Sequence, residues 1–80
     1  MNISQYIKAH NDYTRARIEI ITDLRKRAEK IGLSTVSKKM GKERSYARKM
    51  LSGNPSHDII IQIAETIEEI EKLMEAFNGQ

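Results

Sequence analysis

The stretch GLSTVSKKMGKERSYARKMLSG, residues 32–53, combines dense positive charge with the spacing of a buried face. From Lys38 to Lys49 it holds six Lys and Arg residues and a single acid. Apolar side chains at positions 36, 40, 47, 50 and 51 recur at the intervals of a helix face that packs on a core. This pattern predicts two short helices, of about residues 35–40 and 43–52, joined at Gly41. Ser34 or Thr35 is placed to cap the first of them.

The segments on either side are also helical in their spacing. Residues 3–31 carry apolar side chains three and four apart, and two interpretations are open. They form one long helix, or Asp12 caps a second helix of about residues 13–31 after a short one of about residues 3–10. Gly32 is predicted to end this segment in a left-handed conformation. Pro55 and Ser56 then open a last helix of about residues 57–77.

No segment alternates with a period of two over the length of a strand. The predicted fold class is therefore all-α, with four or five helices in one domain over residues 1–80. The last helix places apolar residues in a heptad pattern that extends beyond what a four-helix core needs. We predict that this pattern forms a dimer seam, with burial against the chain's own helices as the open alternative. The predicted seam consists of Ile63, Ile67, Ile70, Leu73, Met74 and Phe77.

Composition limits the classes of function. The chain has no Cys, which excludes disulfides and thiolate metal sites, and its two His residues are far apart. No constellation of catalytic residues and no phosphate-binding glycine loop is present, so we expect no enzyme activity, cofactor, metal or small-molecule ligand. No apolar run has the length of a membrane span or of a signal-peptide core. The expected location is the cytoplasm.

Charge is divided unevenly along the chain. Residues 1–53 hold thirteen Lys and Arg against five Asp and Glu, a net charge of +8. Residues 54–80 hold one Lys against six acids, a net charge of −5, and the two halves give the overall +3. Such a division predicts that a basic face binds a polyanion while the acidic helix is kept away from it.

Residues 33–53 resemble the helix-turn-helix of the phage repressor and Cro-like (XRE-type) transcriptional regulators. The resemblance covers about Leu24 to Ile67, and SGNPSHDIIIQIAETI continues it after the motif. The matching motif positions, counted from Leu33, are the first-helix core residues Val36 and Met40, the turn residue Gly41, and the second-helix core residues Ala47 and Met50. The chain departs from the family with Leu33 and Ser37 in place of Gln and Ala, and is about two residues shorter before Gly41. It also has Glu43 where Ser or Thr usually caps the second helix.

The resemblance implies a lambda-repressor-like DNA-binding domain with an extended C-terminal helix. It further implies a sequence-specific regulator of double-stranded DNA, a repressor of phage or mobile-element type that acts as a homodimer on a palindromic operator. Its base-contacting residues would be Glu43, Arg44, Ser45 and Arg48. Its phosphate-contacting residues would be Ser34, Thr35, Lys38, Lys39, Lys42, Tyr46 and Lys49. The alternative is a small phage-type inhibitor or antirepressor that acts by binding another protein.

Overall fold

The computed structural model describes residues 2–78 and contains four helices and no strand within them. These are α1 (Ile3–Ile31), α2 (Leu33–Lys39), α3 (Tyr46–Ser52) and α4 (His57–Asn78). The predicted all-α class is confirmed. Across the same residues, no helix offers an apolar window long enough to cross a bilayer.

The long helix α1 is continuous, so the first of the two interpretations of residues 3–31 is the one that forms. Its 29 residues reach about 43 Å at 1.5 Å per residue. The helix begins with a capping box: the Asn2 side chain accepts a hydrogen bond from the Gln5 amide at 2.8 Å, and the Gln5 side chain accepts one from the Asn2 amide at 3.1 Å. With this cap at Asn2, Asp12 lies inside the helix and starts no new one.

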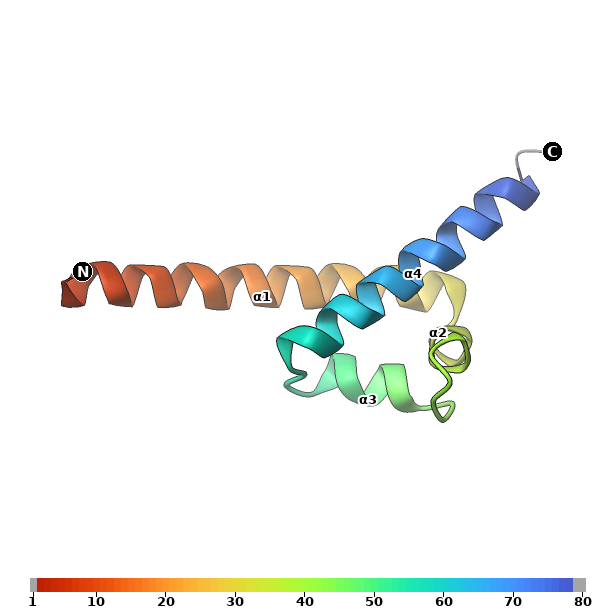
Figure 1. Cartoon of the computed structure of the whole chain (residues 1–80), viewed down its shortest axis with the longest axis horizontal. Helices are drawn as coiled ribbons and strands as arrows, with labels where there is room; N and C mark the ends of the chain where they lie inside the picture. The colour runs from red at the N-terminus through yellow and green to blue at the C-terminus, as the bar shows by residue number, and fades with distance from the viewer. Residues whose placement is uncertain (1, 79–80) are drawn as a thin grey trace.

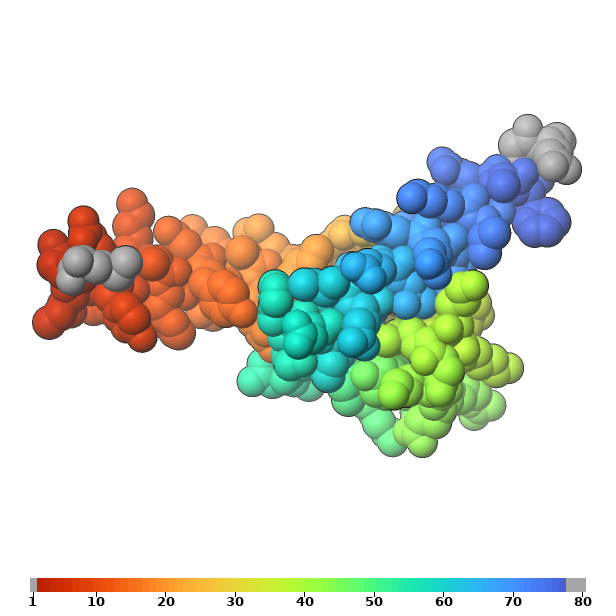
Figure 2. All heavy atoms as spheres, viewed as in Figure 1, coloured from red at the N-terminus to blue at the C-terminus, as the bar shows by residue number. Residues whose placement is uncertain are grey.

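The molecule is elongated, with principal extents of 54 × 28 × 17 Å (Figure 1). Its radius of gyration is 15.3 Å, whereas a compact chain of this length has about 12 Å. Two helix ends project from the packed part of the molecule (Figure 2). We call residues 3–20 of α1 the arm and residues 21–70 the body. Every side chain of the arm is exposed except that of Arg17, which is half-buried.

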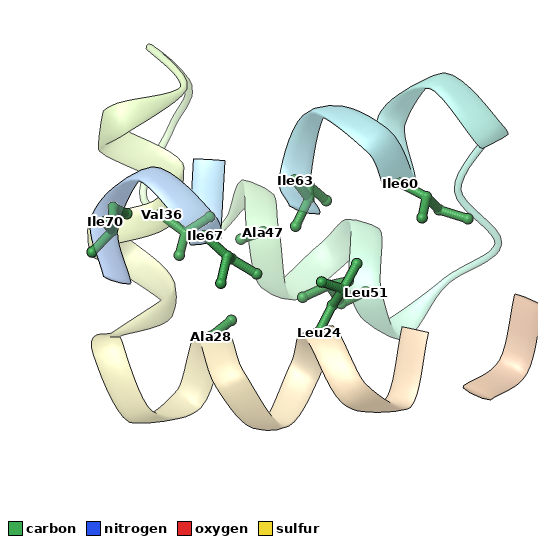
Figure 3. Packing of buried hydrophobic residues seen from close by; sticks show 9 residues of the cluster. All are labelled: Leu24, Ala28, Val36, Ala47, Leu51, Ile60, Ile63, Ile67 and Ile70. Atoms are coloured by element: carbon green, nitrogen blue, oxygen red, sulfur yellow. The ribbon is translucent and has the colours of Figure 1, made fainter. Parts of the chain in front are cut away.

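The core lies between the four helices, with α1 on one side of it and α4 on the other (Figure 3). Its buried hydrophobic side chains are all aliphatic, and burial of each large one stabilises the fold by about 1.5–3 kcal/mol. All four helices contribute. The buried core residues are Leu24, Ala28, Val36, Ala47, Leu51, Ile60, Ile63, Ile67 and Ile70.

Burial of Ile63, Ile67 and Ile70 corrects the predicted dimer seam. These three residues pack inside the body of their own chain, so they present no surface to a second copy. Only Leu73, Met74 and Phe77 of the predicted set remain exposed, in the last turns of α4. The heptad pattern therefore serves the chain's own core for most of its length.

Two helix boundaries also differ from the prediction. Helix α2 begins at Leu33, so Ser34 and Thr35 lie in its first turn and no side chain caps it. Its N-cap is Gly32, which also ends α1 by donating its amide hydrogen to the Ala28 carbonyl at 2.8 Å. This double role places Gly32 at φ +100° and ψ 116°, a positive φ as predicted but outside the left-handed helical region. Helix α3 begins three residues later than predicted, at Tyr46.

Candidate nucleic-acid interface

A tight turn centred on Gly41 joins α2 to α3. Gly41 has φ +73° and donates its amide hydrogen to the Lys38 carbonyl at 2.9 Å. The amide of Lys42 reaches back to the Ser37 carbonyl at 3.0 Å. Together these two bonds form the Schellman pattern, which favours glycine because its positive φ strains any residue with a Cβ. The predicted turn glycine is confirmed.

Ser37 connects the two short helices. Its buried hydroxyl donates to the Leu33 carbonyl within α2 and accepts from the Ala47 amide of α3, both at 2.9 Å. The Ala47 amide is in the first turn of α3, where the helix itself provides no acceptor. Because the N-cap residue Ser45 makes no capping bond with its side chain, Ser37 supplies the cap from the neighbouring helix. The Ser37 hydroxyl thus fixes α3 on α2.

The residues predicted to open the second helix lie in a turn before it. The Tyr46 amide donates to the Glu43 carbonyl at 3.0 Å, which closes this turn. The Glu43 carboxylate accepts hydrogen bonds from the Lys49 ammonium at 2.8 Å and from the Ser45 hydroxyl at 2.9 Å. The bond from Lys49, followed by that from Ser45, lowers the pKa of Glu43. Glu43 does not cap α3, and it offsets part of the charge of Lys49.

The other cations of this region are free of intramolecular ion pairs. Within residues 2–78, the ion pairs join Arg27 to Asp23 and Glu71, and Lys49 to Glu43. The ammonium of Lys42 lies 5.6 Å from the ring centre of the half-buried Tyr46, within the range of a cation–π contact. Between residues 38 and 49, five exposed cations make no ion pair, and we call them the basic face: Lys38, Lys39, Lys42, Arg44 and Arg48.

A shallow depression of about 420 Å³ lies between the start of α2 and the start of α3. It brings together the two arginines predicted to read bases and two serines predicted to contact DNA. The depression also includes Glu29, which the sequence analysis did not select. Only the fold places this residue of α1 beside the arginines. The lining residues are Glu29, Leu33, Ser34, Arg44, Ser45 and Arg48.

Three arginines of α1 hold the rest of the chain in place. Arg25 donates to the carbonyl of Leu51. This carbonyl lies in the last turn of α3, where carbonyl groups lack partners within the helix. Arg17 donates to the Asn54 side chain at 2.7 Å and to the carbonyl of Pro55 in the loop that follows. The bond from Arg25 fixes the C-terminal end of α3 on α1.

Arg27 connects α1 to α4. It bonds both carboxylate oxygens of Glu71, through Nε at 3.1 Å and through Nη2, and also pairs with Asp23 at 3.3 Å. The bond to Glu71 raises the pKa of Arg27, and the same bond lowers the pKa of Glu71. This pair marks the point at which α4 leaves the body.

Compared with known proteins, the chain matches no family model, no curated protein and no solved structure. Its site is therefore interpreted from its own residues and geometry.

Proposed function

We propose that the chain binds double-stranded DNA through the basic face, as a sequence-specific transcriptional regulator with a lambda-repressor-like helix-turn-helix formed by α2 and α3. The observation that carries this proposal is the set of unpaired cations on the α2–α3 unit. Val36, Ala47 and Leu51 fix this unit in the core, while five of its cations are exposed and make no ion pair, and Arg44 and Arg48 line one depression. Exposed, unneutralised cations on two short helices and the segment between them are suited to phosphate.

In this proposal Arg48 on α3 and Arg44 in the preceding turn read base edges in the major groove. A guanidinium can donate two hydrogen bonds to one guanine, which gives it the sequence selectivity that an ammonium lacks. The ammonium groups of Lys38, Lys39 and Lys42 bind phosphates and set the register. The acidic exposed face of α4 is repelled by DNA, so the basic face approaches first. Binding over a promoter would repress it by occlusion.

A homodimer fits this proposal, because a single small helix-turn-helix covers few base pairs. Two copies related by a two-fold axis read the two halves of a palindromic operator about one helical turn apart. The dimer then makes twice as many phosphate contacts as a single copy.

Selection from random duplex DNA, followed by fluorescence anisotropy at several salt concentrations, tests the proposal. We expect Arg48→Ala to weaken binding to the selected site by about 1–3 kcal/mol and to relax preference at one base pair. Lys38→Ala should weaken all duplexes alike and reduce the salt slope by about one. The matched controls are Arg15→Ala and Lys72→Ala, which remove the same charges far from the basic face. Equal binding to every duplex, or equal losses in variants and controls, would reject the proposal.

A second candidate is an inhibitor or antirepressor that binds another protein through the end of α4. The exposed side chains of Leu73, Met74 and Phe77 on an acidic helix favour it. It predicts that Phe77→Ser abolishes capture of a defined protein from nuclease-treated host extract. Arg48→Ala would leave such capture unchanged, which separates the two functions.

A further inference from the structure

We propose that the arm is a self-association interface: the arms of two copies pack antiparallel, and the tip of each arm enters an apolar groove at the base of the other. The tip consists of Ile3, Tyr6 and Ile7. This proposal rests on the arm and the groove alone and does not require DNA binding.

The arm carries a broad apolar stripe that nothing in its own chain covers. Ile3, Tyr6 and Ile7 are 78%, 64% and 52% exposed, and Tyr13 and Ile20 continue the stripe at helical spacing. The stripe follows the same face of α1 that packs in the core farther along at Leu24 and Ala28. The arm therefore presents to solvent the continuation of a core-packing face.

The charged residues of the arm lie almost entirely on its opposite side. Lys8, Asp12, Arg15 and Glu19 recur at intervals of three and four, half a turn away from the stripe. Two are basic and two are acidic, so this side has no net charge. An anionic membrane surface or nucleic acid attracts helices with a basic polar face, which the arm lacks.

The helix of the arm also needs support. Its sequence contains isoleucines, tyrosines, Asn11, Asp12 and Thr14, all of which favour the helix less than Ala, Leu or Lys do. In proteins most helical stability comes from tertiary packing of an amphipathic face rather than from propensity. Packing of the stripe against a partner would supply that stabilisation.

The groove lies where α4 begins to cross α1 and has a volume of about 380 Å³. Its lining is almost wholly apolar, because the guanidinium of Arg17 is bonded to Asn54 and Pro55 and only its aliphatic stem remains to face the groove. The groove and the arm share residues of one helix face. The lining residues are Tyr13, Ala16, Arg17 and Ile20 of α1, and His57, Ile60, Ile61 and Ala64 of α4.

Geometry favours a second copy as the occupant. Tyr6 of the tip and Ile20 of the groove are about 21 Å apart on one helix, at 1.5 Å per residue, and share a face with Tyr13 midway between them. A two-fold axis that crosses α1 near Tyr13 therefore brings each tip to the groove of the other copy, and two equal contacts form together.

The available area is also sufficient. From their exposed fractions, the stripe and Ile61 offer roughly 700 Å² of surface per copy, or about 1,400 Å² in a dimer, within the range of stable interfaces. The exposed end of α4 offers only three large apolar side chains. The arm and its groove thus offer a larger exposed apolar surface than the end of α4 does.

Sedimentation equilibrium of the full chain without DNA tests this interface. We expect a monomer–dimer equilibrium in which Ile7→Asp at the tip and Ile61→Asp at the groove each raise the dissociation constant more than about tenfold. The matched control is Arg15→Asp, because Arg15 is exposed on the charged side of the same helix, half a turn away from the stripe. It should change the constant less than about threefold. A monomer at every concentration, or equal effects of all three variants, would overturn the proposal, with circular dichroism showing that each variant is folded.

Cross-linking tests the antiparallel arrangement, because the chain has no cysteine of its own. Under oxidising conditions, a mixture of the Ile7→Cys chain and the Ile61→Cys chain should form a disulfide-linked dimer. Each variant alone should remain mainly uncrosslinked, since like positions are far apart in the proposed dimer. Efficient linkage of the Ile7→Cys chain to itself would place the two tips together and overturn the proposal. Neither measurement uses DNA, so their failure is distinguishable from failure of the proposed function.

Discussion

Residues 3–20 and residues 21–31 belong to one continuous helix, yet they stand in opposite environments. In the second part, Leu24 and Ala28 are fully buried against α4 and the short helices. In the first part, Ile3, Tyr6 and Tyr13 occupy the same face and are exposed. Apolar periodicity identifies the side of a helix that is suited to burial, but it does not identify which chain provides the burial. The arm and the body therefore share one apolar pattern, and they differ in whether the rest of their own chain covers it.

A substitution in the core and one in the arm should differ most in their effect on the free energy of unfolding. Ile67→Ala should lower the free energy of unfolding by about 2–5 kcal/mol, because it leaves a cavity among fully buried side chains. Ile3→Ala, measured by urea denaturation at low protein concentration, should change it by less than about 0.5 kcal/mol. A large loss from Ile3→Ala in the dilute monomer would show that the arm contributes to the body after all.

Within the body, Ser37→Ala should produce the next largest effect. The change removes the hydroxyl that accepts a hydrogen bond from the Ala47 amide and should lower the free energy of unfolding by about 1–3 kcal/mol. Ser52→Ala, at an exposed serine at the end of α3, is the control and should be nearly neutral. Unchanged or increased stability of Ser37→Ala in thermal and urea melts would mean that α3 does not depend on this bond.

Much of the body could be predicted from the sequence. The order of the helices follows from Gly32, Gly41 and Pro55, and the helical spacing of Val36, Ala47 and Leu51 predicts their burial. These features depend on neighbours in the chain. The glycine turn in particular follows from a backbone conformation that local sequence can encode.

The rest depends on contacts between distant positions. The start of α3 was predicted too early, at about residue 43, although Ser45 is a preferred N-cap type; the hydroxyl that bonds the first turn comes from Ser37 of α2, which only the fold brings there. Arg25 could not be matched to Leu51, because a free carbonyl at a helix end accepts from any donor that the fold brings near. The heptads of α4 fit a core and a dimer seam equally well, and only the crossing of α1 over Ile63 and Ile67 decides between them.

The ion pair between Arg27 and Glu71 lies where α4 leaves the body. Its loss should change the free energy of unfolding less than the two substitutions in the body do. Both side chains are about one-third exposed, so Glu71→Gln should lower the free energy of unfolding by less than about 1 kcal/mol at neutral pH. The pKa of Glu71 is lowered in the folded state, so this stabilisation is present above the ordinary glutamate value of 4.5 and is lost as the pH falls through the folded pKa. Urea denaturation from pH 7 to pH 3 should therefore show the variant and the parent chain converging in acid. Glu75→Gln, farther along the projecting end, should follow the parent at every pH.

The smallest effect concerns the basic face and the neighbouring Glu43, whose carboxylate is bonded to Lys49. Because its carboxylate binds Lys49, Glu43→Gln should release that ammonium for phosphate and strengthen DNA binding about two- to threefold at low salt. The gain should shrink as salt is added, and Glu65→Gln on α4 should not reproduce it. If Glu43 instead accepted a hydrogen bond from a cytosine amino group, the same substitution would weaken binding to the selected site and relax one base pair. Anisotropy with the selected duplex and with a single-base variant distinguishes these outcomes, because only a base reader changes the ratio of the two affinities.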